Sequence, residues 1–370
     1  MRKLDIDLDY LKATLKALLE IPSPSGYTDN VVRYCVGELE KLGLPCRLTR
    51  RGGIRATIAG QEKYPRCAIV SHLDTVGAMV KQLKPNGRLE MMPIGHWSSR
   101  FAEGCRVTIF TDHHGPKRGT ILPLKASGHT FNEEIDTQPV AWDNVEIRTN
   151  DFARNEAELR AEGYRVGDFV AIDPGTEFTP DGFIVSRHLD DKAGVASVLA
   201  AAKAVIESKV TVPTDSNLIF TIAEEVGTGA SSVLHGNTAE LVAVDNATQA
   251  PGQNSRERGV TIAMMDSSGP FDYHLTHKLL DLCEQFELEH QRDVFKYYRC
   301  DAAAAVEAGN DLRVALLCFG LDASHGYERA HITGLSALAQ LLALYIQAGP
   351  IAQRDGTLLG PLSDFPTQPQ

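Results

Sequence analysis

Residues 66–74 have the sequence RCAIVSHLD, in which a short apolar run ends at a histidine and an aspartate. An apolar run of this length predicts a strand buried on both faces, which is typical of a parallel sheet covered by helices. Four further runs of the same kind lie downstream, at residues 183–185, 218–222, 241–244 and 314–319.

Segments with helical periodicity alternate with these strands. The first has Leu11, Leu15, Leu18 and Leu19 on one face, which is the spacing of an amphipathic helix. The alternation predicts an α/β fold with a mostly parallel sheet in an α/β/α sandwich. The predicted helices span residues 5–20, 29–42, 193–207, 271–289 and 332–347.

The character of the chain changes between residues 78 and 181. Short alternating runs, such as RVTIF at 106–110, are separated by Gly, Pro, Asn and Asp. This pattern indicates a small β-barrel. We therefore expect a discontinuous catalytic domain of residues 1–77 and 182–354, interrupted by an inserted barrel domain of residues 78–181.

The composition excludes several classes of partner. The 370 residues are 43 % hydrophobic and 23 % charged, as in ordinary soluble enzymes, and their formal net charge is −11. An acidic chain without a basic stripe is a poor ligand for nucleic acid or an anionic membrane. No apolar run approaches the ~20 residues of a membrane span, and the N-terminal residues do not resemble a secretory signal. We expect a cytoplasmic protein.

The cysteines fit the same location. The chain has seven, and none forms a CxxC pair. Neither a disulfide framework nor a thiolate zinc site is expected, so the cysteines are interpreted as reduced and mostly buried thiols. The tail of residues 355–370 contains three prolines and is expected to be disordered.

Each predicted strand is followed by one or two side chains that can bind a metal ion. In open α/β sheets, ligands bind beyond the carboxyl ends of the strands. Five separate strand ends therefore deliver these side chains to one edge of the sheet. The side chains are His72 and Asp74, Asp190 and Asp191, Glu224 and Glu225, Asp245, and His325.

Two imidazoles and three carboxylates suit a pair of divalent ions such as zinc or cobalt. Without a cation, carboxylates so close together would repel one another and take up protons. Two ions ~3.5–4 Å apart can share a water, lower its pKa and polarise a carbonyl group. One carboxylate must stay free of metal to accept the proton of that water.

The order and spacing of these pieces resemble the M42 family of metallo-aminopeptidases, which includes tetrahedral and glutamyl aminopeptidases. The resemblance covers nearly the whole chain. Within the family, the chain most resembles a bacterial subgroup associated with gene clusters for the osmoprotectant N-acetylglutaminylglutamine amide. The matching motifs are IPSPSGY at 21–27, SHLDTVG at 71–77, PIGHW at 93–97, GYRVGD at 163–168, LDDKAG at 189–194, AEEVG at 223–227 and the strand end at Asp245.

The resemblance implies how the metal ligands are shared. Asp190 would bridge the two ions. His72 and Asp245 would complete the shell of one ion, and Glu225 and His325 would complete the shell of the other. No organic cofactor is implied.

The resemblance also implies the roles of the neighbouring residues. Glu224 would be the general base, and Asp74 would hydrogen-bond the far nitrogen of His72 and orient its ring. The wider fold implies a cis peptide between Asp190 and Asp191. The inserted barrel would make subunit contacts and shape the substrate entrance, in a homo-oligomer built from dimers and extending in the family to a dodecamer.

Two segments depart from the family pattern. The usual final motif is closer to Arg-Tyr-x-His-Ser, whereas residues 324–329 are SHGYER, and His331 further on competes with His325 for the ligand role. The usual Gly-Thr-Asp-Ala is replaced by RCDA at 299–302. This second change bears on specificity more than on metal binding.

Each motif also has a structural explanation. Asp190–Asp191 would suit the N-terminus of a helix, because Asp is a favoured N-cap residue. Glu224–Glu225 would suit a solvated helix start, and Asp245–Asn246 would suit a turn. Their joint occurrence favours the metal site. His113–His114 lies in a Gly/Pro-rich loop and is interpreted as surface.

The sequence therefore predicts a two-metal aminopeptidase, with zinc as the first choice of ion and cobalt as the alternative. It would cleave peptides that have a free N-terminus through a metal-bridging hydroxide, with Glu224 as the base. The alternative is a related binuclear amidase or deacylase that acts on a small acylated dipeptide, because the same ligands would serve. A glycosidase needs two uncoordinated carboxylates, and a non-catalytic scaffold would not need the complete ligand set.

Overall fold

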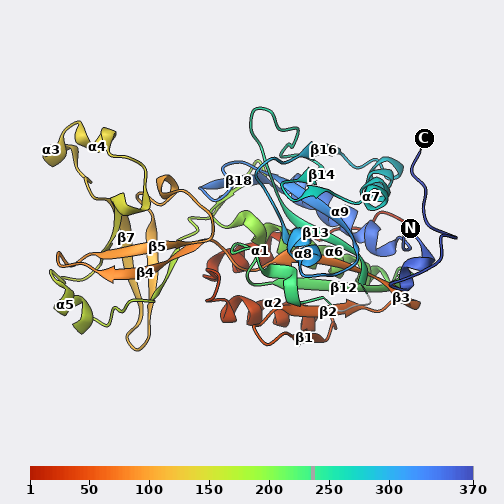
Figure 1. Ribbon diagram of the computed structural model, residues 1–370, viewed down its shortest axis with the longest axis horizontal. Helices are drawn as coiled ribbons and strands as arrows, with labels where there is room; N and C mark the ends of the chain where they lie inside the picture. The colour runs from red at the N-terminus through yellow and green to blue at the C-terminus, as the bar shows by residue number, and fades with distance from the viewer. Residues whose placement is uncertain (235–237, 370) are drawn as a thin grey trace.

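The computed structural model describes residues 1–234 and 238–369, and it divides the chain into a sheet covered by helices and a smaller barrel (Figure 1). The barrel projects from one end of the larger body, at the left of Figure 1. Both termini lie at the opposite end of the molecule.

The larger body is built on a nine-stranded sheet in the order β1-β2-β12-β3-β13-β17-β14-β15, with β16 also paired to β14. The central strands β12, β3, β13 and β17 run parallel to one another. Antiparallel neighbours flank this centre, because β2 pairs with β12 and β14 pairs with β17. The predicted, mostly parallel α/β sheet is confirmed. The strands are β1 (Cys46–Leu48), β2 (Ile54–Ile58), β3 (Glu62–His72), β12 (Thr214–Thr221), β13 (Thr238–Thr248), β14 (Val260–Asp266), β15 (Gly269–Pro270), β16 (His290–Val294) and β17 (Arg313–Leu321).

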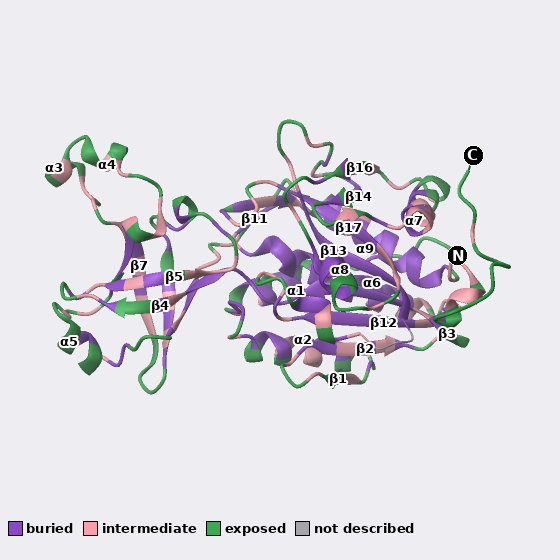
Figure 2. Cartoon of the chain, viewed as in Figure 1, coloured by how far each residue is buried: buried purple, intermediate pink, exposed green. Residues whose placement is uncertain are grey.

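Alternate side chains of the central strands face opposite layers, so the sheet is covered on both faces. On β3, Cys67 and Ile69 pack into the larger core, whereas Ala68 and Val70 pack into the smaller one. Figure 2 shows the central strands and α6 as buried. The larger core includes α1 (Leu8–Glu20), α2 (Asp29–Lys41), α6 (Leu189–Ser208), α7 (Tyr273–Gln285) and α9 (Ile332–Gln347), and the smaller one includes α8 (Asp301–Glu307).

Capping residues set the helix ends more tightly than periodicity predicts. The first helix begins at Leu8 because the Asp7 side chain accepts a hydrogen bond from the Tyr10 backbone N–H. In the same way, Asp272 accepts from the Leu275 N–H and starts α7 at Tyr273.

The barrel is closed, with the strand order β4-β5-β8-β7-β6-β9. Its inward-facing residues, among them Val80, Val107, Ile109, Ile121 and Ile147, form a core separate from those of the main sheet. The predicted barrel is therefore present, and its division from residues 1–77 and 182–354 as a separate domain stays a proposal. The strands are β4 (Gly77–Leu83), β5 (Leu89–Ile94), β6 (Arg106–Thr111), β7 (Gly115–Pro123), β8 (Val145–Thr149) and β9 (Phe169–Ile172), and the short helices α3 (Gly128–Phe131), α4 (Glu134–Thr137) and α5 (Glu156–Ala161) lie between them.

A third, three-stranded sheet packs against β17, α6 and α9 of the larger body. It contains β10 (Glu177–Phe178), β11 (Phe183–Ser186) and β18 (Glu328–His331), all antiparallel. The prediction that 183–185 is a strand is confirmed, but its assignment to the main parallel sheet is wrong. A short apolar run indicates burial and does not specify which strand pairs with it.

The remaining features of the fold are the cysteines, the lengths of the helices and the C-terminal tail. All seven cysteines are free. Among the described residues, no helix is both long enough and apolar enough to cross a membrane. After the turn at Gln353–Gly356, the described part of the tail forms no helix or strand. The predicted disorder of the tail stays a prediction, and Gln370 lies outside the described residues.

Candidate metal centre

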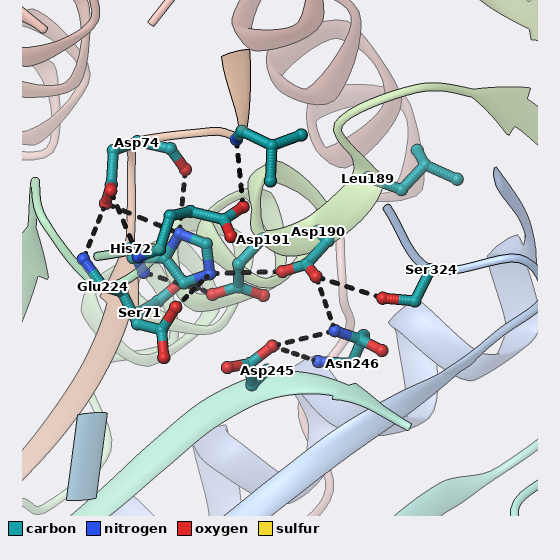
Figure 3. A network of polar contacts seen from close by, with 12 residues as sticks. Ser71, His72, Asp74, Leu189, Asp190, Asp191, Glu224, Asp245, Asn246 and Ser324 are labelled. Carbon is teal, nitrogen blue, oxygen red and sulfur yellow. Dashed lines mark hydrogen bonds and ion pairs between the residues drawn. The ribbon is translucent and has the colours of Figure 1, made fainter. Parts of the chain in front are cut away.

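The five predicted ligands gather at the carboxyl ends of the central parallel strands. His72 is the last residue of β3, Glu225 lies in the turn after β12, and His325 lies in the turn after β17. Figure 3 shows His72, Asp190 and Asp245 pointing toward one another from separate segments of the chain.

Two of the ligands reach the site by a different route from the one predicted. Asp190 does not follow a strand of the main sheet, because β11 belongs to the small antiparallel sheet. It lies at the start of α6 instead. Asp245 does not follow a strand either. It lies within β13, because the strand continues to pair with β17 as far as Thr248.

Asp190 lies at the centre of the cluster, and each of its oxygens faces a different histidine. Oδ1 lies 3.2 Å from His72 Nε2, and Oδ2 lies 3.2 Å from His325 Nε2. The peptide between Asp190 and Asp191 is cis, as expected. A carboxylate placed in this way suits a bridge between two ions.

The described residues contain two groups of side chains whose ligand atoms all lie within 4.8 Å of one another. One group is His72, Asp190 and Asp245, and the other is Asp190, Glu225 and His325. The two groups share Asp190. The geometry therefore brings together all five residues, and their roles as ligands stay a proposal.

Asp74 organises the turn that follows β12. Its carboxylate accepts hydrogen bonds from Glu224 N at 3.1 Å, from Glu225 N at 3.3 Å and from Ser25 Oγ. His72 Nδ1 bonds the backbone carbonyl of Asp74 at 2.9 Å, whereas the carboxylate oxygen is 3.7 Å away. The predicted contact of His72 with the Asp74 carboxylate is therefore replaced by a contact with the Asp74 carbonyl, because the carboxylate binds the backbone N–H groups of the two glutamates.

Three polar residues to which the sequence assigned no role complete the site. Asn246 Nδ2 donates to Asp190 Oδ2 at 2.8 Å and to Asp245 Oδ1 at 3.1 Å. Ser324 Oγ lies 3.3 Å from Asp190 Oδ2. Glu328 accepts from the His325 backbone N–H at 2.9 Å. The sequence could have pointed to these three residues only through their position, because each lies next to or near a predicted ligand.

The structure also separates the alternatives. His331 lies outside the cluster, because its Nε2 bonds the Asp181 carbonyl at 2.9 Å and its Nδ1 bonds Thr333 Oγ1 at 2.7 Å. Asp191 Oδ2 binds Ser71 Oγ at 2.5 Å and the His72 N–H, and Asp191 Oδ1 has no hydrogen-bond partner among the described residues, so this carboxylate makes no capping bond to α6. His113–His114 is exposed at the turn between β6 and β7.

The charges of the cluster act strongly on one another. Burial raises the pKa of Glu225 to about 8 and that of Asp245 to about 7. Burial lowers the pKa of His325, but the charges of Glu225 and Asp190 outweigh it and raise this pKa to about 11. The two histidines keep the pKa of Asp190 well below its usual range in spite of burial. Carboxyl groups that take up protons near neutral pH are those that a divalent cation would stabilise.

Known proteins share both the sequence pattern and the fold. The sequence model described as M42 glutamyl aminopeptidase matches residues 52–341. The protein YhfE of Bacillus subtilis is 35 % identical over 90 % of this chain and 96 % of its own length. The glutamyl aminopeptidase of Lactococcus lactis is 27 % identical over 59 % of this chain and 61 % of its own length.

Solved structures extend the likeness to the fold. A TET aminopeptidase from a thaumarchaeal archaeon of marine sediment superposes with a TM-score of 0.83 at 20 % identity, over 92 % of this chain and 96 % of that one. The TET1 peptidase of Pyrococcus horikoshii gives 0.79 at 22 % identity, over 90 % of this chain and 98 % of that one. At these identities the likeness is one of fold.

We expect the metal-free protein to lose stability as the pH rises from about 5 to about 8.5. Glu225 and Asp245 have folded-state pKa values of about 8 and about 7, above the ~4 of an unfolded chain. The folded state therefore binds more protons in this window, and its unfolding free energy falls as the pH rises. His325, with a pKa of about 11, acts in the same direction above its unfolded value of ~6.5.

Denaturant unfolding of chelated protein at several pH values measures this dependence. Saturating zinc should remove most of it, because the ion holds the ligands deprotonated. The Asp245→Asn variant, which lacks one of the titrating groups, should show a shallower dependence. An unfolding free energy that rises across the window would contradict the electrostatic description.

Proposed function

The chain belongs to the M42 glutamyl aminopeptidase family, and from that premise we propose that it is a two-metal aminopeptidase that removes N-terminal residues from peptides. Membership makes it a metal-dependent hydrolase of peptides. The observation that supports the two-metal form is the position of Asp190, whose oxygens each face a histidine of a different ligand group.

The donor set fits two divalent ions. His72, Asp190 and Asp245 would hold one ion, and Asp190, Glu225 and His325 would hold the other. Imidazole and carboxylate donors suit zinc, with cobalt as the alternative. When bound, such a pair lowers the pKa of a water and polarises a carbonyl group.

Glu224 would accept the proton of the attacking water and return it to the amine of the leaving peptide. It belongs to neither ligand group, its side chain is 13 % exposed, and Oε2 lies 3.8 Å from His72 Nε2. Burial raises the pKa of Glu224 well above its usual range, which suits a group that exchanges a proton near neutral pH. Asp74 fixes the position of this residue through the Glu224 backbone N–H.

The substrate would approach the ion pair at a small pocket between the two bodies, with a volume of about 10 Å³. The lining combines Val76, Trp97 and Ile172 from the barrel side with Arg187 and Gly326 from the side of the sheet, next to the ligands Asp190, Glu225 and His325. The barrel also supports the site directly, because His325 Nδ1 bonds the His96 carbonyl at 2.8 Å. The peptide N-terminus would therefore meet the ion pair where barrel and sheet adjoin.

We further propose that the protein is a homo-oligomer built from dimers, in which the barrel makes subunit contacts. The Pyrococcus horikoshii TET1 peptidase assembles into a tetrahedron or a large octahedral shell. Size-exclusion chromatography with light-scattering detection should give a mass of at least two chains of 40.3 kDa each. A monomer at micromolar concentration would contradict this assembly and leave the catalytic proposal intact.

The activity itself is tested with a panel of aminoacyl anilides and short peptides with free or acetylated N-termini. We expect release from free amines only, abolished by chelation and restored by zinc or cobalt, because the α-amino group and the first carbonyl would bind at the ion pair. Hydrolysis of blocked substrates alone would assign a binuclear amidase of acylated dipeptides instead. Chelator-resistant hydrolysis would contradict the metal mechanism.

Replacement of the base should separate catalysis from metal binding. We expect Glu224→Gln to lower kcat by ~10²–10⁴, the usual contribution of a general base, while both ions remain bound. Glu40→Gln, an exposed position on α2, is the matched control and should retain full activity. Loss of the ions together with the activity in Glu224→Gln would exclude the role of base and indicate that of a ligand.

A further inference from the structure

Glu328 connects two segments of the metal centre through backbone hydrogen bonds. It is the first residue of β18 and pairs with Ser186 at the end of β11. Its Oε2 accepts from Leu189 N at 2.7 Å and Asp190 N at 3.3 Å, and its Oε1 accepts from His325 N at 2.9 Å. One carboxylate thus binds both the segment that carries Asp190 and the segment that carries His325.

The buried Glu328 side chain fixes the position of the main chain. Glu328 is 1 % exposed, and a buried carboxylate is unfavourable unless hydrogen bonds satisfy it. The donors named above are all backbone N–H groups, so the carboxylate fixes the main chain and not another side chain. A glutamine at this position would offer a single acceptor oxygen, and its amide group would face a backbone donor.

The two segments contain backbone that needs such support. His188, just before Leu189, has a φ of 69°, and His325 itself has a φ of 63°. Residues with a side chain rarely adopt this left-handed conformation, and they keep it where the surrounding structure holds them. The N–H groups that Glu328 binds belong to His325 itself and to the two residues that follow His188.

We propose that Glu328 is a positioning residue that sets the distance between Asp190 and His325 by binding the backbone of both. The inference rests on the two-metal function proposed above and adds a residue to it. The His325 ring is oriented separately, by the His96 carbonyl. Loss of Glu328 should therefore act chiefly on the ion held by Asp190, Glu225 and His325, because both Asp190 and His325 lie on segments that Glu328 binds. It should act less on the ion held by His72, Asp190 and Asp245, because only Asp190 of this group lies on such a segment.

The test compares Glu328→Gln with Glu240→Gln in the full chain. Glu240 is also 1 % exposed and accepts a backbone hydrogen bond, from Ile351 N at 2.7 Å. It pairs with Lys278 and lies near the start of β13, before Asp245 in the strand, and it belongs to neither ligand group. Both variants replace one buried carboxyl group with an amide, and only Glu328→Gln alters the metal centre. Calorimetric titration with Zn²⁺ and the absorption spectrum with Co²⁺ measure the binding of the two ions, and neither measurement depends on activity.

We expect Glu328→Gln to bind one ion ~10–100-fold more weakly, the usual effect of a residue that supports a metal ligand, and to lower kcat more than it changes KM. Glu240→Gln should lose stability and bind both ions as the wild type does. Wild-type affinity for both ions in Glu328→Gln would overturn the inference. A wild-type protein that binds no ion pair would overturn the proposed function and this inference with it.

A second variant tests the positioning role of Glu328 if Glu328→Gln does not fold. Glu328→Asp retains the carboxyl group but is shorter by one methylene group, so we expect it to bind the backbone of only one of the two segments. It should show a smaller loss of affinity for the same ion. A folded Glu328→Asp protein with wild-type binding of both ions would also count against the inference.

Discussion

The shared carboxylate of Asp190 is the contact on which the rest of the site depends. Its oxygens face His72, the last residue of β3, and His325, which lies in the turn after β17. Each histidine is fixed from behind, His72 by the Asp74 carbonyl and His325 by the His96 carbonyl. Because both imidazoles are held in this way, the position of Asp190 decides whether the two ligand groups join into one centre.

The charge of the centre follows from the same geometry. Carboxyl groups are brought together in a buried place, where burial raises the pKa of Glu225, Asp245 and Glu224. The protein offsets part of this repulsion with backbone N–H groups, as in the contacts of Asp74 to the two glutamates. The negative charge that is not offset makes the cluster complementary to divalent cations, and a bound cation would reduce the repulsion among the acidic groups.

The barrel and the sheet are both needed to build the centre. The segment after β5 reaches over the carboxyl ends of the strands, where it supplies the His96 carbonyl and the ring of Trp97. Gly95 allows this approach, because its φ is 81° and a side chain there would lie 2.9 Å from Val76 and 3.5 Å from Glu225. The small sheet of β10, β11 and β18 packs against β17, α6 and α9 of the larger body, beside the segments that carry Asp190 and His325.

The sequence by itself determined the α/β class, the barrel and the residues of the cluster, because apolar runs report burial and the polar residues after them report the strand ends. Tertiary structure alone decided which strands pair. It placed β11 in a separate sheet, Asp245 within β13, and His331 on the Asp181 carbonyl while His325 joined the site. It also exchanged the carboxylate of Asp74 for its carbonyl and recruited Glu328. Local patterns carry periodicity and burial, whereas pairing and contact depend on partners that lie far away in the chain.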